Sequence, residues 1–407
     1  MKYTLVCKKC GHEIASFREW FNHDQVCPQC GSNHVEVKYN TDYHKLTELF
    51  KEKNPQNFWH YFDFLPLEDT KNIVTCNEGA IPIEEWSFLE KFAKEKYGID
   101  CKAMVYRNDL NGGTNSFKDV AAAMAAGILK ENGVKEYCLA STGNTATAFS
   151  KYLSLAGVKF TVFVPNCVCE DTVAEIRSHG QNLVISEGDY SQAKKQAADF
   201  HKQNHVLISG GNIDPIRVEA KKTMVFEFLR QMGRMPDVYV QAVSGGTGPI
   251  AVDKGVREIN NAFPDVKLPK MVLIQQDTCD PMVQGWERAL KSNFADGYEK
   301  DFPVIPNPQT MVSILSTGNP GMYPILAPIV RKSGGTFLRV KESQLVDFAK
   351  IAWKERNVLL GPAAAVCLAG FYKALEAGEI KNGQTVLINT GEGAARAKQF
   401  AEKVKMD

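Results

Sequence analysis

The sequence predicts an α/β fold built on parallel strands, preceded by a small metal-binding module at the N-terminus. Three observations support this prediction. The 407 residues include 44% apolar and 23% charged side chains, which is typical of a globular protein with a sizeable core. Two Cys-x-x-Cys pairs stand near the N-terminus. From about residue 135 onward, short apolar runs rich in β-branched residues alternate with longer helical patterns.

The N-terminal module is predicted to span residues 1–38 and to bind a structural Zn2+ ion. Its two Cys-x-x-Cys pairs are separated by sixteen residues, and four thiolates close a tetrahedral zinc site with no open position. A module of this size buries too little apolar surface to fold alone, so metal binding would supply its folding free energy. Two redox pairs of thiols are the alternative interpretation. The predicted metal ligands are Cys7, Cys10, Cys27 and Cys30.

The rest of the chain is predicted to alternate strands with helices. Strands are expected over residues 136–140, 160–165, 183–186, 206–209, 238–243, 271–276, 336–340 and 386–390. Helices are expected after Lys118, from Thr145, from Asp171, over 190–202, over 215–232, from Pro249, near Pro281 and over 342–355. Strands this apolar are buried on both faces of a parallel sheet. Ligands bind such sheets beyond the carboxyl ends of the strands, so we expect the site in the loops that follow them.

One of these loops carries a lysine in an unusual setting. The stretch NGGTNSFKD, residues 111–119, leads into a helix of small residues, so Lys118 lies between Phe117 and an Ala-rich helix. Partial desolvation there would lower the pKa of the amine and suit it to form a Schiff base. A solvated lysine at a helix start is the alternative.

Three further loops have the composition of anion sites or turns. Residues 141–145, STGNT, offer hydroxyls and backbone N–H groups at a helix N-terminus, which suits a carboxylate or a phosphate. Residues 244–248, SGGTG, let the backbone wrap an anion. This loop lacks the lysine of a Walker motif and the spacing of GxGxxG, which disfavours nucleotide binding. Residues 389–393, NTGEG, would alone be read as a turn.

Together and in this order, the motifs resemble fold type II pyridoxal-phosphate (PLP) enzymes, most closely the threonine synthase family. SFKD is similar to that family's cofactor-lysine motif, ASTGNT to its substrate-carboxylate loop and VSGGTG to its cofactor-phosphate loop. PxRxExxKT from Pro215 and GNP at 318–320 extend the resemblance over nearly the whole chain. It implies a tryptophan synthase β-like catalytic region over 39–407. Within that region, a smaller mobile α/β domain at about 130–215 would be inserted in the larger cofactor-binding domain.

The resemblance also implies residue roles. Lys118 would form an aldimine with PLP and then move protons, and Thr390 would face the pyridine nitrogen of the cofactor. Arg217 would bind the phosphate leaving group of the substrate. The substrate carboxylate would meet Ser141, Thr142 and Thr145. The remaining cofactor contacts would come from Asn144 at the phenolate oxygen and, around the phosphate, from Ser244, Gly245, Gly246, Thr247 and Gly248.

The activity implied is that of a carbon-oxygen lyase, which converts O-phospho-L-homoserine and water to L-threonine and phosphate. Three departures from the family's pattern keep an alternative open. The loop at 245–249 lacks the asparagine of the usual GNxGN, Glu392 replaces a histidine, and Ser316 stands where an arginine is often found. Each of these changes removes a positively charged or hydrogen-bond-donating group from the neighbourhood of the substrate. The alternative is β-replacement on O-phosphoserine, as in cysteine or cysteate synthases; a third hypothesis is nucleic-acid or partner binding through the zinc ribbon.

Charge and composition bear on partners and location. Lys and Arg total 48 against 47 for Asp and Glu, and the ribbon has no basic run beyond Lys8 and Lys9, which argues against nucleic acid. The sequence contains no apolar stretch long enough for a secretory signal or a membrane span, so we expect a cytoplasmic protein. The resemblance implies a homodimer.

Overall fold

The computed structural model describes residues 2–393 and 397–406 and contains three sheets. The first sheet forms the N-terminal ribbon, in which β1 (Tyr3–Cys7) pairs antiparallel with β2 (Glu13–Ile14) and β3 (Val35–Tyr39). Helix α1 (Phe17–Asn22) lies between β2 and β3 in the chain; Ser16 caps it by accepting a hydrogen bond from the Glu19 N–H. Alternate residues of β1 are buried, so this small sheet has one apolar face.

The second sheet has four parallel strands in the order β8-β7-β6-β9. Its strands are short and apolar, as the sequence predicted, and the helices follow them at the expected places. Helix α4 begins directly after Lys118 and packs against α5. The elements are α4 (Asp119–Glu131), β6 (Glu136–Ala140), α5 (Asn144–Leu155), β7 (Lys159–Val164), α6 (Glu170–Ser178), β8 (Asn182–Ile185), α7 (Tyr190–Asn204) and β9 (Leu207–Ile208).

The third sheet has six strands in the order β12-β11-β10-β13-β5-β4. Five are parallel: β5 (Lys102–Tyr106), β10 (Val238–Ala242), β11 (Lys270–Gln276), β12 (Thr336–Val340) and β13 (Thr385–Asn389). The edge strand β4 (Ile83–Glu85) runs antiparallel to β5, whereas the sequence predicted only parallel pairing. A three-residue strand with two glutamates has no apolar pattern that could reveal it.

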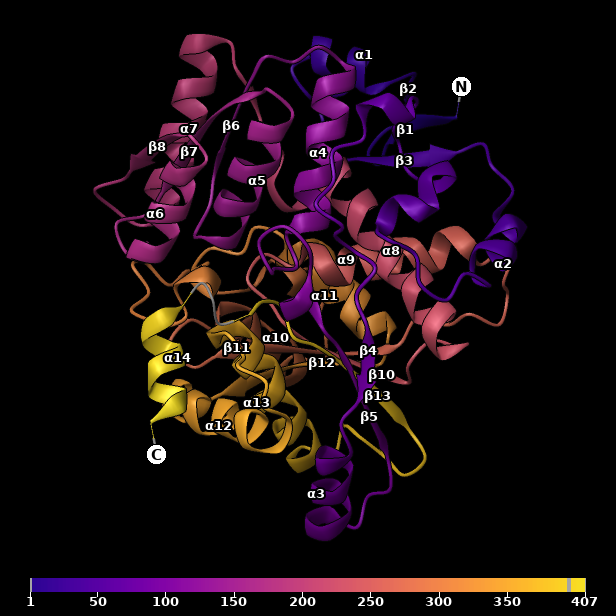
Figure 1. The fold of residues 1–407 in the computed structure, drawn as a ribbon, viewed down its shortest axis with the longest axis vertical. Helices are drawn as coiled ribbons and strands as arrows, with labels where there is room; N and C mark the ends of the chain where they lie inside the picture. Colours follow the sequence, from indigo (N-terminus) through magenta and orange to yellow (C-terminus); the bar gives the residue numbers. More distant parts are fainter. Residues whose placement is uncertain (1, 394–396, 407) are drawn as a thin grey trace.

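Helices cover both faces of this sheet, because its strand residues point alternately to two apolar clusters. One face carries α8 (Pro215–Met232), α9 (Thr247–Ile259), α10 (Pro281–Lys291) and α11 (Tyr323–Lys332). The other carries α3 (Ser87–Tyr97), α12 (Leu345–Arg356), α13 (Pro362–Glu376) and α14 (Lys398–Lys405), seen at the lower end of Figure 1. The short helix α2 covers Leu46–Leu49, and 3-10 turns cover Tyr43–Lys45, Phe58–Phe64, Thr70–Asn72, Asn108–Leu110, Gly211–Ile213, Tyr298–Lys300, Ser313–Leu315 and Glu342–Gln344.

Most predicted helix bounds agree with the structure. The helix predicted over 215–232 is observed with those bounds, where Asp214 caps its first turn. The helix expected from Pro249 begins instead at Thr247, because Gly246 has a positive φ of 88° and turns the chain sharply enough to start it earlier. The helix expected over 342–355 opens as a 3-10 turn before α12.

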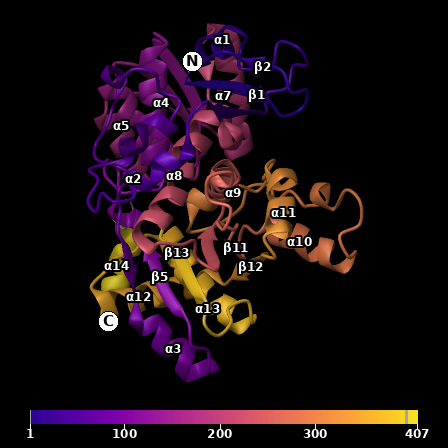
Figure 2. The ribbon, with the colours of Figure 1, turned by 90° about the vertical axis from the view of Figure 1, so that its right-hand side faces the viewer.

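The ribbon packs against the body of the protein at α4 and α8. Its buried side chains belong to the same apolar cluster as the Ala-rich face of α4. The Tyr39 hydroxyl donates a hydrogen bond to Glu219 of α8 at 2.7 Å, and Glu36 pairs with Arg257 of α9 at 2.8 Å. Figures 1 and 2 show the ribbon at the end of the molecule opposite α12 and α3. Among the described helices, none has the length and apolar character needed to span a bilayer.

Candidate active site

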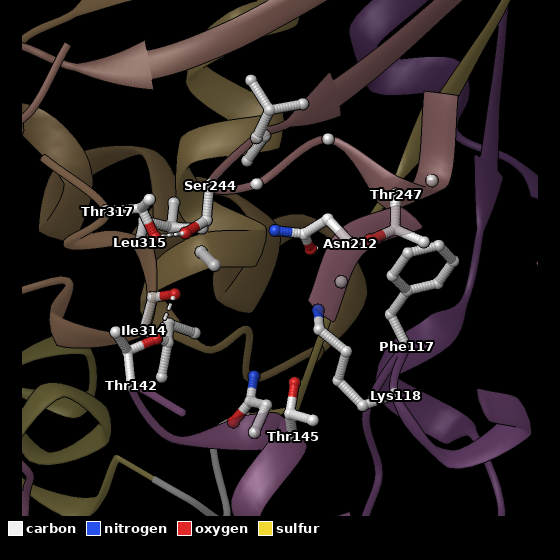
Figure 3. Close-up of a pocket in the computed structure, with 18 of the residues that line it drawn as sticks. Phe117, Lys118, Thr142, Thr145, Asn212, Ser244, Thr247, Ile314, Leu315 and Thr317 are labelled. Atoms are coloured by element: carbon white, nitrogen blue, oxygen red, sulfur yellow. Dashed lines mark hydrogen bonds between the residues drawn. The ribbon is translucent and has the colours of Figure 1, made fainter. Parts of the chain in front are cut away.

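A cavity lies between loops of the second and the third sheet. The loops that follow β6 and β10 line it, together with the start of α4. Figure 3 shows Lys118 and Asn212 pointing into it, with Thr142 and Thr145 on one side and Ser244 and Thr247 on the other. The predicted site residues that it brings together are Lys118, Ser141, Thr142, Asn144, Thr145, Arg217, Ser244, Gly245, Gly246, Thr247 and Gly248.

Lys118 is held by a tightly bonded loop at the start of α4. The Asp119 carboxylate accepts hydrogen bonds from the backbone N–H of Thr114 at 3.0 Å and of Ser116 at 2.9 Å. The Lys118 Nζ lies 5.2 Å from the centre of the Phe117 ring. Burial lowers the pKa of Lys118 to about 8, although the nearby Glu392 carboxylate opposes the shift. An amine with this pKa is far more nucleophilic near neutral pH than an ordinary lysine.

The loop at 141–145 forms the second wall. The Ser141 Oγ accepts hydrogen bonds from the N–H groups of Gly143 and Ala146, both at 3.1 Å, and the Thr142 hydroxyl donates to the Ile314 carbonyl at 3.1 Å. Gly143 allows a close approach, since a Cβ there would lie 2.7 Å from the Ile314 side chain. Because α5 begins at Asn144, the positive end of its dipole faces the cavity.

The loop at 244–248 has the shape of a phosphate cradle. A Cβ on Gly245 would lie 1.9 Å from the Asn212 amide, and one on Gly248 would lie 2.6 Å from Gln241. A side chain at either position would have to displace Asn212 or Gln241, whereas glycine leaves the backbone N–H groups open to a ligand without such a shift. Helix α9 starts at Thr247, so its N-terminus points at the same place. A phosphate cradle and a nucleophilic lysine in one cavity fit the phosphate and the aldehyde of PLP.

Arg217 supplies a second site for an anion. Its side chain is buried, its guanidinium lies 5.1 Å from the centre of the Phe149 ring, and its Nη1 donates to the Gly211 carbonyl at 3.2 Å. Within the described part of the chain it has no carboxylate partner, and its Nε is buried without a hydrogen bond. An unneutralised guanidinium in a cavity suits a carboxylate or a phosphate on a ligand.

Thr390 lies at the edge of this arrangement and does not line the cavity. Its Oγ1 lies 2.8 Å from Asp109 Oδ1 and 3.1 Å from the Tyr106 carbonyl. Its contact with the pyridine nitrogen remains a prediction. Glu392, two residues later, does line the cavity, where it accepts hydrogen bonds from the Ala363 N–H at 2.8 Å and from Asn144 Nδ2 at 3.3 Å.

Several lining residues were not predicted from the sequence. Asn212 comes from the turn before α8, and its Oδ1 accepts a hydrogen bond from the Thr247 hydroxyl at 2.7 Å. Lys221 lies four residues after Arg217, a spacing that places both on one face of a helix and could have revealed it. The others, such as Tyr190, Gln241, Thr317 and Cys367, carry no local motif.

The four ribbon cysteines converge as predicted. The sulfur atoms of Cys7 and Cys30 lie 3.6 Å apart, as do those of Cys10 and Cys27, and all four lie within 4.8 Å of one another. Two thiolates on one Zn2+ ion, with Zn–S bonds of about 2.3 Å, are separated by about 3.8 Å. The cluster is therefore compatible with a closed zinc site, and zinc itself remains a prediction.

Comparison with known proteins identifies the family. Residues 76–391 match the model of the pyridoxal-phosphate-dependent enzyme family. The threonine synthase of Methanocaldococcus jannaschii is 28% identical, with 98% of this chain and 96% of the relative covered, and that of Methanosarcina acetivorans is 29% identical, with 96% and 91% covered. The threonine synthase of Mycobacterium tuberculosis is 27% identical over 82% of this chain and 86% of its own length.

Solved structures share the fold at low sequence identity. The diaminopropionate ammonia lyase of Escherichia coli superposes with a TM-score of 0.67 at 14% identity, covering 100% of this chain and 97% of its own. The cysteine synthase of Entamoeba histolytica gives 0.62 at 17% identity, covering 81% and 90%. The chain therefore belongs to the pyridoxal-phosphate-dependent enzyme family and has the fold of its type II members.

Proposed function

We propose that the protein is a PLP-dependent lyase of the threonine synthase type, which converts O-phospho-L-homoserine and water to L-threonine and phosphate. The observation that carries the proposal is the buried, unneutralised Arg217 in the same cavity as the loop at 141–145. A substrate with a carboxylate at one end and a phosphate at the other matches two separate anion sites. The relatives named threonine synthase support the same reaction.

Each end of the substrate meets its own set of groups. Ser141, Thr142 and Thr145, with the N-terminus of α5, bind the α-carboxylate. The Arg217 guanidinium binds the phosphate with two parallel hydrogen bonds. It also stabilises the negative charge that the phosphate gains when it leaves Cγ. Fixing both ends restricts the carbon chain between them, which lowers the entropic cost of reaction.

Lys118 moves the protons in this scheme. When bound, PLP supplies an electron sink for negative charge on the α-carbon of an amino acid. With a pKa of about 8, the Lys118 amine both accepts and donates protons near neutral pH. It takes a proton first from the substrate Cα and then from Cβ, and phosphate leaves from Cγ with the electrons of the C–O bond. Protons return to Cγ and to Cα. Water adds its hydroxyl at Cβ, and its remaining proton balances the one that the released phosphate takes up.

Phosphate release from O-phosphohomoserine and from O-phosphoserine, each with and without sulfite, tests the proposal. We expect release from O-phosphohomoserine together with formation of threonine, and no turnover by Lys118→Ala. Arg217→Ala should lower kcat/KM by about 100-fold or more, and Arg217→Lys should recover only part of the loss because it lacks the planar fork. Release from O-phosphoserine alone, dependent on sulfite, would overturn the proposal.

That last outcome would support the second candidate, β-replacement on O-phosphoserine. Two observations favour it. The loop at 244–248 carries no amide side chain of its own, and the amide beside it comes from Asn212. In addition, the Glu392 carboxylate lines the cavity and repels a second anion.

A further inference from the structure

Lys221 is a second lysine that lines the cavity, and the proposed reaction does not use it. It lies on α8, one turn after Arg217, and is 2% exposed. Its Nζ lies 4.7 Å from the centre of the Phe117 ring, the same ring that the Lys118 Nζ approaches at 5.2 Å. Within residues 2–393 and 397–406, it has neither an acidic partner nor a hydrogen bond. A buried ammonium without a counter-ion is costly unless a ligand brings one.

The surroundings of Lys221 point to the glycine loop as the place of that counter-ion. Phe117, which Lys221 touches, packs on the loop so closely that a Cβ on Gly248 would lie 3.0 Å from the tip of its ring. Long side chains on a helix lean toward its N-terminus, which here is the end of α8 that faces the cavity. Lys221 and the loop line the same cavity. The loop already offers backbone N–H groups and the positive end of α9 to an anion.

The charges in the cavity agree with this placement. Among the residues that the structure describes, three cationic side chains line it, Lys118, Arg217 and Lys221, against the one carboxylate of Glu392. Burial, together with the nearby charges of Lys118 and Arg217, lowers the pKa of Lys221 well below that of an ordinary lysine. A phosphate monoester carries between one and two negative charges at neutral pH, and its arrival would restore the charged form of the amine.

We propose that Lys221 is a phosphate-binding residue, whose ammonium contacts the phosphate monoester held by the glycine loop at 244–248. The cofactor is the expected source of that phosphate. The inference rests on the cofactor of the family and is independent of the substrate proposed above, because its main test measures binding without turnover.

The test compares PLP with pyridoxal, which has the aldehyde but no phosphate, in titrations of the cofactor-free protein followed by absorbance. Lys221→Met should weaken PLP binding by about 10-fold or more, as expected for loss of a charged hydrogen bond, and should change pyridoxal binding less than about twofold. Lys221→Arg should keep most of the preference for PLP. Lys221→Gln serves as a second neutral variant if methionine disturbs the packing.

The matched control is Lys194→Met. Lys194 makes a similar contact, 5.0 Å from the centre of the Tyr190 ring, but does not line the cavity, so its variant should bind PLP as the wild type does. The 31P resonance of bound PLP gives a second readout, which should shift in Lys221→Met and not in Lys194→Met.

A second arm separates the two sources of phosphate. Binding of O-phosphoserine and of serine to the PLP-loaded protein is followed by the cofactor absorbance. If the Lys221 variants lose the preference for O-phosphoserine over serine but keep the preference for PLP over pyridoxal, then Lys221 binds the phosphate of the substrate and not that of the cofactor. If both preferences survive in both neutral variants, Lys221 is not a phosphate-binding residue.

Discussion

At the scale of single residues, the cavity contains two buried lysines, Lys118 and Lys221, whose pKa values are lowered by burial. The Lys118 amine reacts only when it is deprotonated. Its pKa of about 8 means that about a tenth of the molecules hold a free amine at pH 7, hundreds of times more than for a pKa of 10.5. Raising the pH through 8 therefore raises the fraction of molecules with a deprotonated Lys118 amine, and a further increase above pH 9 changes this fraction little.

We expect acylation of Lys118 in the cofactor-free protein to follow this titration. Its rate, measured by mass spectrometry of the peptide containing residue 118, should reach half its maximum near pH 8. Glu392→Gln removes a carboxylate that raises the pKa of Lys118, so its midpoint should move to lower pH. A midpoint near 10.5 in the wild type would contradict the burial argument.

At the scale of elements, the ribbon is predicted to depend on its metal. Cys27 is buried within the cluster, and each of the four sulfurs contributes to one closed site. Cys27→Ser should lower bound zinc from about one ion per chain to less than about a fifth of that, measured by elemental analysis of the purified protein. Cys167→Ser is the control, because Cys167 is exposed and lies outside the cluster. Equal zinc content in the two variants would refute the site.

Helix α8 connects the ribbon to the cavity. Glu219 accepts the hydrogen bond from Tyr39 and pairs with the fully buried Lys222 at 2.6 Å, half a turn or so from Arg217. Tyr39→Phe removes one hydrogen bond to a buried carboxylate, so thermal unfolding should report a loss of about 1.5–3 kcal/mol. Tyr97→Phe should be close to neutral, because the Tyr97 ring packs against Phe92 and its hydroxyl makes no hydrogen bond to any described residue. Equal stability of the two variants would show that the Tyr39 hydrogen bond does not stabilise the contact between the ribbon and α8.

Sequence patterns predicted the elements that local chemistry determines. The helix over 215–232 was predicted from a helical pattern that begins at Pro215, and the parallel strands from β6 onward were predicted from their short apolar runs. The parallel strand β5 was not predicted, because it precedes the alternating pattern that starts near residue 135. Strand β4 was missed, since pairing with β5, and not its own residues, makes it a strand. Asn212 and Lys221 were missed for a similar reason: only the tertiary structure brings them to the glycine loop.

At the scale of the whole molecule, the cavity has two walls that belong to different sheets. The loop at 141–145 follows β6 of the four-stranded sheet, whereas the loop at 244–248 follows β10 of the six-stranded sheet. Polar contacts join the first loop to other segments of the half that contains the six-stranded sheet: the Thr142 hydroxyl donates to the Ile314 carbonyl, and Asn144 donates to Glu392. A ligand that binds to both walls adds contacts that exist only when they are close together. The predicted mobility of the region at about 130–215 would then become a closing motion driven by substrate.

Hydrogen exchange tests this motion. Adding O-phosphohomoserine to the PLP-loaded Lys118→Ala variant, which binds without turnover on our proposal, should slow exchange of the amides at 141–147 by about 10-fold or more, because a bound carboxylate holds the N-terminus of α5 in place. Inorganic phosphate is the control ligand. It offers one anion, which cannot bind Arg217 and the N-terminus of α5 at the same time, so it should protect these amides much less than the substrate does. Equal protection by the two ligands would mean that the walls are already fixed and that the smaller sheet does not move as a unit.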